Sequence, residues 1–123
     1  MPADGTIVAC LCAAWCDVCR EYQSGFSALA SDYPEVAFHW VDIEHDPAWQ
    51  EDWDIEDFPT ILVQRGETVV FLGPMLPQPL QLRRVLESLL TMDAAACAQH
   101  AESSAEHRAW QRMNEFGRKL QAR

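Results

Sequence analysis

Residues 15–19 read Trp-Cys-Asp-Val-Cys, and this stretch decides how the rest of the chain is interpreted. An apolar run at residues 6–12 leads into it, and a helical pattern follows it. Two cysteines separated by two residues, where a strand gives way to a helix, can form a small reversible disulfide. The first cysteine then lies at a helix N-terminus, where backbone N–H groups and the helix dipole stabilise a thiolate. On spacing alone, half of a zinc site is the alternative interpretation.

The composition fits one globular domain. The chain has 123 residues, 49% of them hydrophobic, and a formal net charge of -10, which argues against binding to nucleic acid or to an anionic membrane surface. Residues 1–5 show neither a basic region nor a long apolar segment, so we expect no signal peptide, no membrane span and a cytoplasmic location. The five cysteines, four of them within residues 10–19, are not spaced like a secreted disulfide framework.

The first part of the chain predicts a parallel strand–helix–strand unit. Residues 6–12 are nearly all apolar, as expected of a strand that is buried on both faces. A helix is predicted from Cys16 to about Asp32, because one of its faces collects the apolar residues Tyr22, Phe26, Leu29 and Tyr33. Residues 36–43 predict the second strand, and the helix between the two strands makes them parallel.

The middle of the chain predicts a short helix and an antiparallel hairpin. Residues 46–53 form the short helix, with Asp46 as N-cap and with Trp49 and Trp53 on its inner face. Residues 60–64 and 68–72 are two strands joined by a tight turn. An amphipathic helix follows at about residues 79–92, with the apolar residues Leu80, Leu82, Val85, Leu86, Leu89 and Leu90.

The remaining residues, 93–123, predict a helical C-terminal extension. Asp93 can cap one helix, and Ser103 to Glu106 offers a capping box for another. An apolar stripe then either packs on the preceding domain, which we favour, or forms a dimer contact; its members are Trp110, Met113, Phe116 and Leu120. We therefore divide the chain into a domain at residues 1–92 and an extension at 93–123, and expect a monomer or a weak dimer through these helices.

The order of these elements resembles that of the thioredoxin family. Residues 15–19 look like the family's Trp-Cys-x-x-Cys motif, and residues 58–60 (Phe-Pro-Thr) look like its cis-proline segment. Gly66 and Gly73 fall where the family has the hairpin glycine and the glycine after the last strand. The resemblance implies a thioredoxin-like α/β fold over about residues 5–91, with a four-stranded mixed sheet and helices on both faces.

The resemblance also implies a mechanism and no cofactor. Cys16 would attack a substrate disulfide as a thiolate, and Cys19, one helical turn inside, would resolve the mixed disulfide. Pro59 would pack against the cysteine pair and present backbone groups to the substrate, and Trp15 would exclude water. We expect a protein disulfide as substrate and a dithiol, not identified by the sequence, as electron donor.

The chain departs from typical thioredoxins around the motif. Cys10 stands where the family has a buried Asp that helps to move the proton of the resolving thiol, and Trp40 stands where that Asp has a Lys partner. Cys12 replaces an aromatic residue. Asp17 puts a negative charge beside Cys16, which disfavours a thiolate and predicts a reductant rather than an oxidant.

The other cysteines allow further interpretations. Cys10, Cys12, Cys16 and Cys19 together could hold zinc or an iron–sulfur cluster, or Cys12 and Cys16 could form a regulatory disulfide. We favour the simpler hypothesis that Cys10 and Cys12 point into the packed interior, and we assign no metal site. Cys97 is expected to be a bystander, with a role in dimerisation as the alternative.

Eight acidic residues between positions 42 and 57, with no intervening Lys or Arg, make the last notable pattern. A solvated face explains most such runs. Because Asp57 precedes Phe58 and Pro59, the run could also line the substrate groove and favour a basic partner. We therefore assign Trp15, Asp57, Phe58 and Pro59 to substrate binding. A non-enzymatic chaperone or assembly factor with an acidic binding surface is the alternative function.

Overall fold

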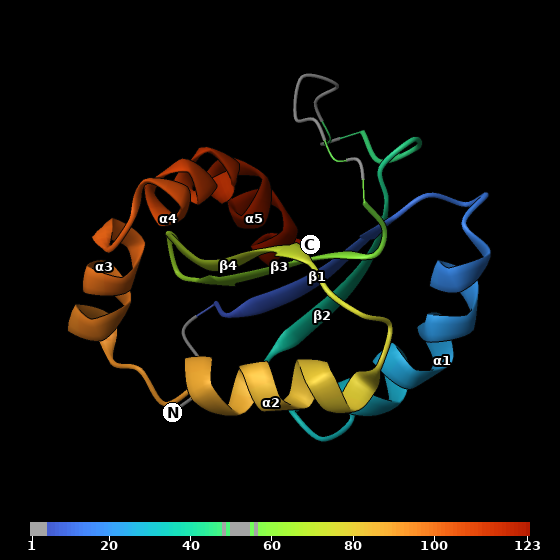
Figure 1. Cartoon of the computed structure of the whole chain (residues 1–123), viewed down its shortest axis with the longest axis horizontal. Helices are drawn as coiled ribbons and strands as arrows, with labels where there is room; N and C mark the ends of the chain where they lie inside the picture. Colours follow the sequence, from blue (N-terminus) through green and yellow to red (C-terminus); the bar gives the residue numbers. More distant parts are fainter. Residues whose placement is uncertain (1–4, 48, 50–54, 56) are drawn as a thin grey trace.

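A four-stranded mixed sheet forms the centre of the molecule (Figure 1). The computed structural model describes residues 5–47, 49, 55 and 57–123. The sheet consists of β1 (Ile7–Cys12), β2 (Ala37–Asp42), β3 (Thr60–Arg65) and β4 (Thr68–Pro74). The strands are ordered β2-β1-β3-β4 across the sheet. Strand β1 is parallel to β2, and β3 is antiparallel to both β1 and β4. The predicted thioredoxin-like sheet is confirmed.

Strand β1 lies inside the molecule on both of its faces. None of its six residues is more than 1% exposed. Alternate side chains of a strand point to opposite faces. Accordingly Val8, Cys10 and Cys12 belong to one apolar cluster, and Ile7, Ala9 and Leu11 belong to the other. The prediction of a strand buried on both sides is confirmed, and the sheet needs a cover on each face.

Helices α1 (Asp17–Ala30) and α2 (Pro79–Leu89) cover the first face (Figure 1). The predicted stripes supply the contacts: Tyr22, Phe26 and Leu29 from α1, and Leu82, Leu86 and Leu89 from α2. The expected placement of Leu80 is wrong, because its side chain is 58% exposed at the beginning of α2. The contacts of α2 with the cluster begin at Leu82.

Four short helical segments follow α2: α3 (Ala94–Glu102), α4 (Ala105–Trp110), the 3-10 turn η1 (Gln111–Met113) and α5 (Asn114–Gln121). The last two, η1 and α5, cover the second face of the sheet, whereas the buried Cys97 of α3 belongs to the first cluster. Met113, Phe116 and Leu120 are fully buried against residues of β1, β3 and β4. The expected packing of the apolar stripe on the domain is confirmed, and these three side chains are not available for the alternative dimer contact.

The Gln64 side chain on β3 links the sheet to α5 by a hydrogen bond. Its Nε2 donates to the Asn114 carbonyl at 2.9 Å and to the Gly66 carbonyl at 3.0 Å. A Cβ atom at Gly117 would lie 1.8 Å from Gln64 Oε1, so glycine permits the close approach of helix and strand. Glycine at this helix position therefore has a packing reason.

The helix caps of the extension agree with the sequence except in one position. Asp93 caps α3 and accepts a hydrogen bond from the Ala96 backbone N–H at 2.8 Å, as predicted. The cap of α4 is Ser104, which accepts from the His107 N–H, so the box predicted from Ser103 is displaced by one residue. Ser103 instead ends α3 and donates to the His100 carbonyl.

The helix predicted at residues 46–53 lies mostly outside the described residues, and so does Trp53. Asp46 forms a bidentate ion pair with Arg123: Nη2 donates to Oδ1 at 2.6 Å and Nη1 donates to Oδ2 at 2.8 Å. The Asp46 side chain is only 9% exposed. Trp49 packs edge-on against Phe116, with ring centroids 5.2 Å apart.

In the part of the chain that the structure describes, no helix is long and apolar enough to cross a membrane.

Phe116→Ala should test whether the extension is integral to the fold. It removes a fully buried ring from the second cluster, so we expect the free energy of unfolding to fall by about 3–5 kcal/mol. Denaturant unfolding followed by circular dichroism measures the loss. The control is Lys119→Ala on the exposed side of α5, which should change stability by less than about 0.5 kcal/mol. A Phe116→Ala loss below about 1 kcal/mol would show that α5 contributes little.

Candidate active site

Cys16 lies at the point where the buried strand passes into the first helix. It is the N-cap residue of α1, with extended backbone angles, and its side chain is half-buried. Its backbone N–H donates to the Ala13 carbonyl at 3.0 Å, which closes the turn between strand and helix. The N-cap position of Cys16 agrees with the prediction from sequence, and it places this residue at the positive end of the helix dipole.

Arg20 holds the same turn from the helix side. Its Nη1 donates to the Ala14 carbonyl at 3.0 Å, and its Nη2 is paired with Asp17 Oδ1. The negative charge of Asp17 beside Cys16, expected from the sequence to disfavour a thiolate, is therefore paired with a positive charge. The only sequence signal for this role of Arg20 is its spacing of three residues from Asp17 on one helix.

Cys19 lies one helical turn after Cys16 and is only 1% exposed to solvent. Burial raises the pKa of the Cys19 thiol well above its usual range, and hydrogen bonds with Cys12 and Cys16 raise it further. The thiol therefore keeps its proton at neutral pH. This environment suits a thiol that reacts second, after a disulfide has formed on the more accessible Cys16.

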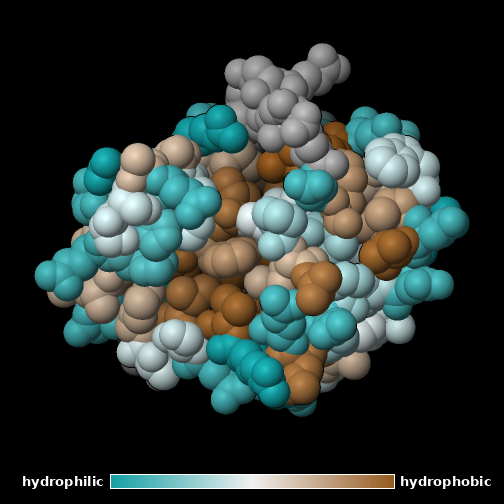
Figure 2. Space-filling model, in the orientation of Figure 1, coloured by the Kyte–Doolittle hydropathy of each residue, from teal (hydrophilic) through white to brown (hydrophobic). Residues whose placement is uncertain are grey.

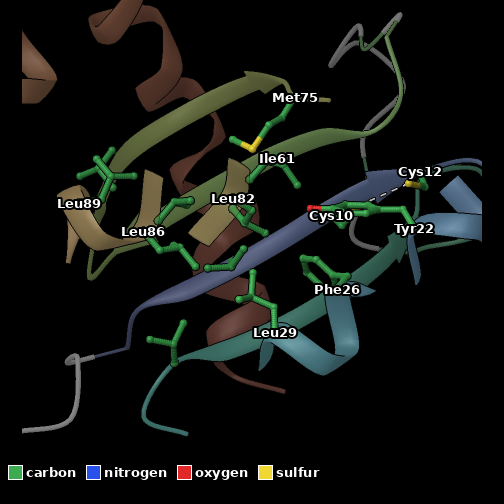
Figure 3. Close-up of a cluster of buried hydrophobic side chains, with 14 of the residues drawn as sticks. Cys10, Cys12, Tyr22, Phe26, Leu29, Ile61, Met75, Leu82, Leu86 and Leu89 are labelled. Carbon is green, nitrogen blue, oxygen red and sulfur yellow. Dashed lines mark hydrogen bonds between the residues drawn. The ribbon is translucent and has the colours of Figure 1, made fainter. Parts of the chain in front are cut away.

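Cys10 and Cys12 lie among the buried apolar side chains of the first cluster, close to Tyr22 (Figure 3). Their Sγ atoms lie 3.5 Å apart in a hydrogen bond, which is the largest cause of the raised pKa of Cys12. Cys10 is paired in register with Trp40 on β2. Both thiols lie within the apolar cluster, as predicted. Burial, followed by the charges of these two cysteines, also raises the pKa of Tyr22.

The remaining interpretations of the cysteines concern a metal site and a disulfide between two chains. No group of three or more His, Cys, Asp or Glu side chains among the described residues is arranged to hold a metal ion, and all five cysteines are described. Cys97 is 5% exposed and accepts a hydrogen bond from Arg65 Nη1 at 3.5 Å. Its burial leaves it poorly placed for a disulfide between two chains.

The segment predicted to hold the cis-proline lies beside the motif. The Phe58–Pro59 peptide bond is cis, as expected from the resemblance. The Trp15 ring, 64% exposed, stands edge-on to the Phe58 ring with centroids 5.6 Å apart. Pro59 is buried and its carbonyl accepts a hydrogen bond from the Met75 N–H at 3.3 Å, so that acceptor is already engaged within the chain. Asp57 is exposed next to Phe58.

The acidic run is less uniform than the sequence indicates. Asp42 is hydrogen-bonded to His45, and Asp46 is paired with Arg123. Half of the eight acids lie outside the described residues: Glu51, Asp52, Asp54 and Glu56. Of the acids assigned to a solvated face, at least Asp46 is instead almost buried against the C-terminus.

A hollow of about 250 Å³ lies behind the motif, between the end of β1, the first turns of α1 and the end of β2. Cys12 and Cys19 line it on the inner side, and Asp42 and Trp40 line it from β2. In the sequence Asp42 is only one member of an acidic run. Its position in the lining of this hollow follows from the parallel pairing of β1 with β2, which puts Asp42 opposite Cys12.

Comparison with known proteins agrees with this geometry. The family model described as Thioredoxin matches residues 2–74, more than half of the chain. The chain belongs to the thioredoxin family. The matched segment includes the whole sheet, both cysteines of the motif and the Phe58–Pro59 bond.

Individual relatives are distant. A thioredoxin H-type of Picea mariana is 34% identical over 58 residues, which are 46% of each chain. The alignments cover 32% of an Arabidopsis thaliana relative and 46% of one from Streptomyces coelicolor, so the chain spans less than half the length of these curated relatives. The thioredoxin of Fasciola hepatica superimposes with a TM-score of 0.61 at 25% identity, over 70% of this chain and 83% of that one.

Alkylation should distinguish the two thiols. With limiting iodoacetamide at neutral pH, we expect Cys16 to be modified at least about tenfold faster than Cys19, because Cys19 is buried and its pKa is raised. In Cys16→Ser, modification of Cys19 should accelerate as the pH rises, since a raised pKa delays formation of the thiolate. Peptide mass spectrometry measures both rates, with buried Cys97 as an internal control. Faster labelling of Cys19 would contradict the assignment.

Proposed function

We propose that this chain reduces protein disulfides through the Cys16 and Cys19 dithiol. One arrangement supports the proposal above all others: an accessible thiol at a helix N-terminus has a buried thiol one turn behind it. The Trp15–Phe58 contact brings the cis-proline segment to the same surface. Membership of the thioredoxin family supports the same class of chemistry.

The reaction has two exchanges. The Cys16 thiolate attacks one sulfur of a substrate disulfide, forms a mixed disulfide and releases the other sulfur as a thiolate, which takes a proton from solvent. Cys19 then loses its proton and attacks Cys16 Sγ, which forms the Cys16–Cys19 disulfide and releases the second substrate sulfur. A dithiol donor restores the pair. The substrate gains two electrons and the protein loses two.

The surroundings of Cys16 bear on the choice of substrate. Trp15 offers an exposed aromatic ring directly before Cys16 in the chain, the half-buried Phe58 ring stands edge-on to it, and Asp57 adds a negative charge beside Phe58. We propose a peptide or protein segment with basic residues near its disulfide. The net charge of -10 favours the approach of such a partner. We also propose a cytoplasmic location, where thiols are kept reduced.

A reductase assay tests the function directly. With dithiothreitol as electron donor and insulin as disulfide substrate, wild type should accelerate reduction and Cys16→Ser should be inactive. Cys19→Ser should accumulate a mixed disulfide between Cys16 and the substrate, because the resolving thiol is missing; gel mobility and mass spectrometry detect it. Cys97→Ser, remote from the motif, should retain wild-type activity.

Equal and negligible activity of wild type, Cys16→Ser and Cys19→Ser would reject the reductase. Prevention of the aggregation of an unfolding protein by all three would then favour the alternative, a non-enzymatic chaperone or assembly factor.

Salt should reveal the proposed preference for basic substrates. Raising the ionic strength from low to about 0.5 M should slow reduction of a lysine-rich disulfide peptide by about tenfold, because screening weakens steering by the acidic protein. Stopped-flow measurement of the second-order rate constant tests this. A peptide of the same length with glutamates in place of lysines is the control and should not be slowed. Equal salt responses of the two peptides would remove the claim.

A further inference from the structure

The resolving step needs a group that takes the proton of Cys19. The Cys19 thiol is buried, and its raised pKa keeps it neutral before it reacts. A neutral thiol is a poor nucleophile, so its proton must leave as its sulfur attacks. The neighbouring Cys12 is itself buried and hydrogen-bonded to Cys10, and burial and that bond raise its pKa too, so it is not a suitable acceptor.

The hollow behind the motif connects Cys19 to a carboxylate. Cys19 and Asp42 both line this space of about 250 Å³, and Asp42 is the only carboxylate among its lining residues within the described chain. Water occupies about 30 Å³ per molecule in the liquid, so the hollow has room for a short chain of water molecules. Arg20, which also lines it, can only donate hydrogen bonds.

Asp42 is held in place at this edge. Its Oδ1 accepts a hydrogen bond from the Glu44 N–H at 3.0 Å, and its Oδ2 lies 2.9 Å from His45 Nδ1. Its side chain is 31% exposed, so the carboxylate contacts both the hollow and solvent. The charged or titratable groups that line the hollow with it are Arg20 and Cys19 from α1 and Cys12 from β1, and His45 contacts it from its own turn.

We propose that Asp42 accepts the proton of Cys19, through water in this hollow, when Cys19 resolves the mixed disulfide. The proposal rests on the proposed function of the dithiol. The S–H bond of Cys19 breaks and its proton passes to the Asp42 carboxylate. A bond forms between the Cys19 and Cys16 Sγ atoms, the bond between Cys16 and the substrate sulfur breaks, and the substrate leaves as a thiolate. Asp42 then returns the proton to solvent through its exposed side.

Ellman's reagent, a small aromatic disulfide that releases a coloured thiolate, separates the two exchanges. Rapid mixing of one equivalent with reduced protein should give a first phase, attack by Cys16, and a second phase, resolution by Cys19. Asp42→Asn keeps an oxygen for the Glu44 N–H but loses the base. We expect its first phase to be unchanged and its second phase to slow by about 10²-fold, the lower end of the contribution of a positioned base.

Two further variants separate a chemical role from a structural one. Glu35→Gln removes an exposed carboxylate outside the hollow and should leave both phases unchanged. In Asp42→Ala, added formate should accelerate the slow second phase, since a small carboxylate can enter the space that the side chain has left. The same concentration of sodium chloride should not. Circular dichroism establishes that each variant is folded.

The outcomes distinguish this proposal from the proposed function. If wild type shows both phases and Asp42→Asn resolves within about twofold of it, Asp42 is not the acceptor, although the dithiol works. A slow second phase in Asp42→Ala that formate does not accelerate would likewise overturn the proposal. If wild type shows no second phase, or if Cys19→Ser still shows one, the proposed dithiol reaction itself fails.

Discussion

The structure depends on the burial of β1 on both of its faces. All six residues from Ile7 to Cys12 are shielded from solvent, and the active-site turn follows immediately. A strand of this kind needs apolar partners above and below it. Helices α1 and α2 supply them on one side, and η1 and α5 supply them on the other, with Phe116 fully buried there. Cys16 is thus displayed at the end of a rigid strand, which fixes its position relative to Pro59.

The same strand determines the unusual interior behind the dithiol. On the side of β1 that faces α1, the inward-facing residues include two small thiols, Cys10 and Cys12. At these two positions typical thioredoxins have a buried Asp and an aromatic residue. The two thiols fill part of the space with apolar sulfur and leave a hollow beside Cys19. The inward-facing residues of β1 therefore include no carboxylate, whereas Asp42, at the end of the neighbouring strand β2, lines the hollow. The proposed proton transfer from Cys19 accordingly uses a group on β2 instead of one on β1.

Most of the fold could be predicted from sequence because the decisive signals are local. The apolar run of β1, the apolar stripe of α1 and the hairpin each lie within a short stretch of sequence. Pro59 belongs to a segment that resembles the cis-proline segment of the family. Two errors are local: Leu80 is exposed, and Ser104 takes the cap position predicted for Ser103. The features that the sequence did not reveal are contacts between distant segments. Asp46 and Arg123 are 77 positions apart, and neither periodicity nor capping rules predict their ion pair. The proposed role of Asp42 depends on strand register and on a space left by small side chains, which no single stretch of sequence displays.

Redox titration with peptide mapping tests the central claim, that Cys16 and Cys19 form one reversible dithiol. The protein is equilibrated in dithiothreitol or glutathione buffers of graded potential, and its disulfides are then assigned by mass spectrometry. The account predicts a single two-electron transition that links Cys16 to Cys19, at a potential more negative than about −200 mV, because burial of Cys19 disfavours its thiolate. A first disulfide between Cys10 and Cys12, or a potential as oxidising as about −180 mV, would contradict it.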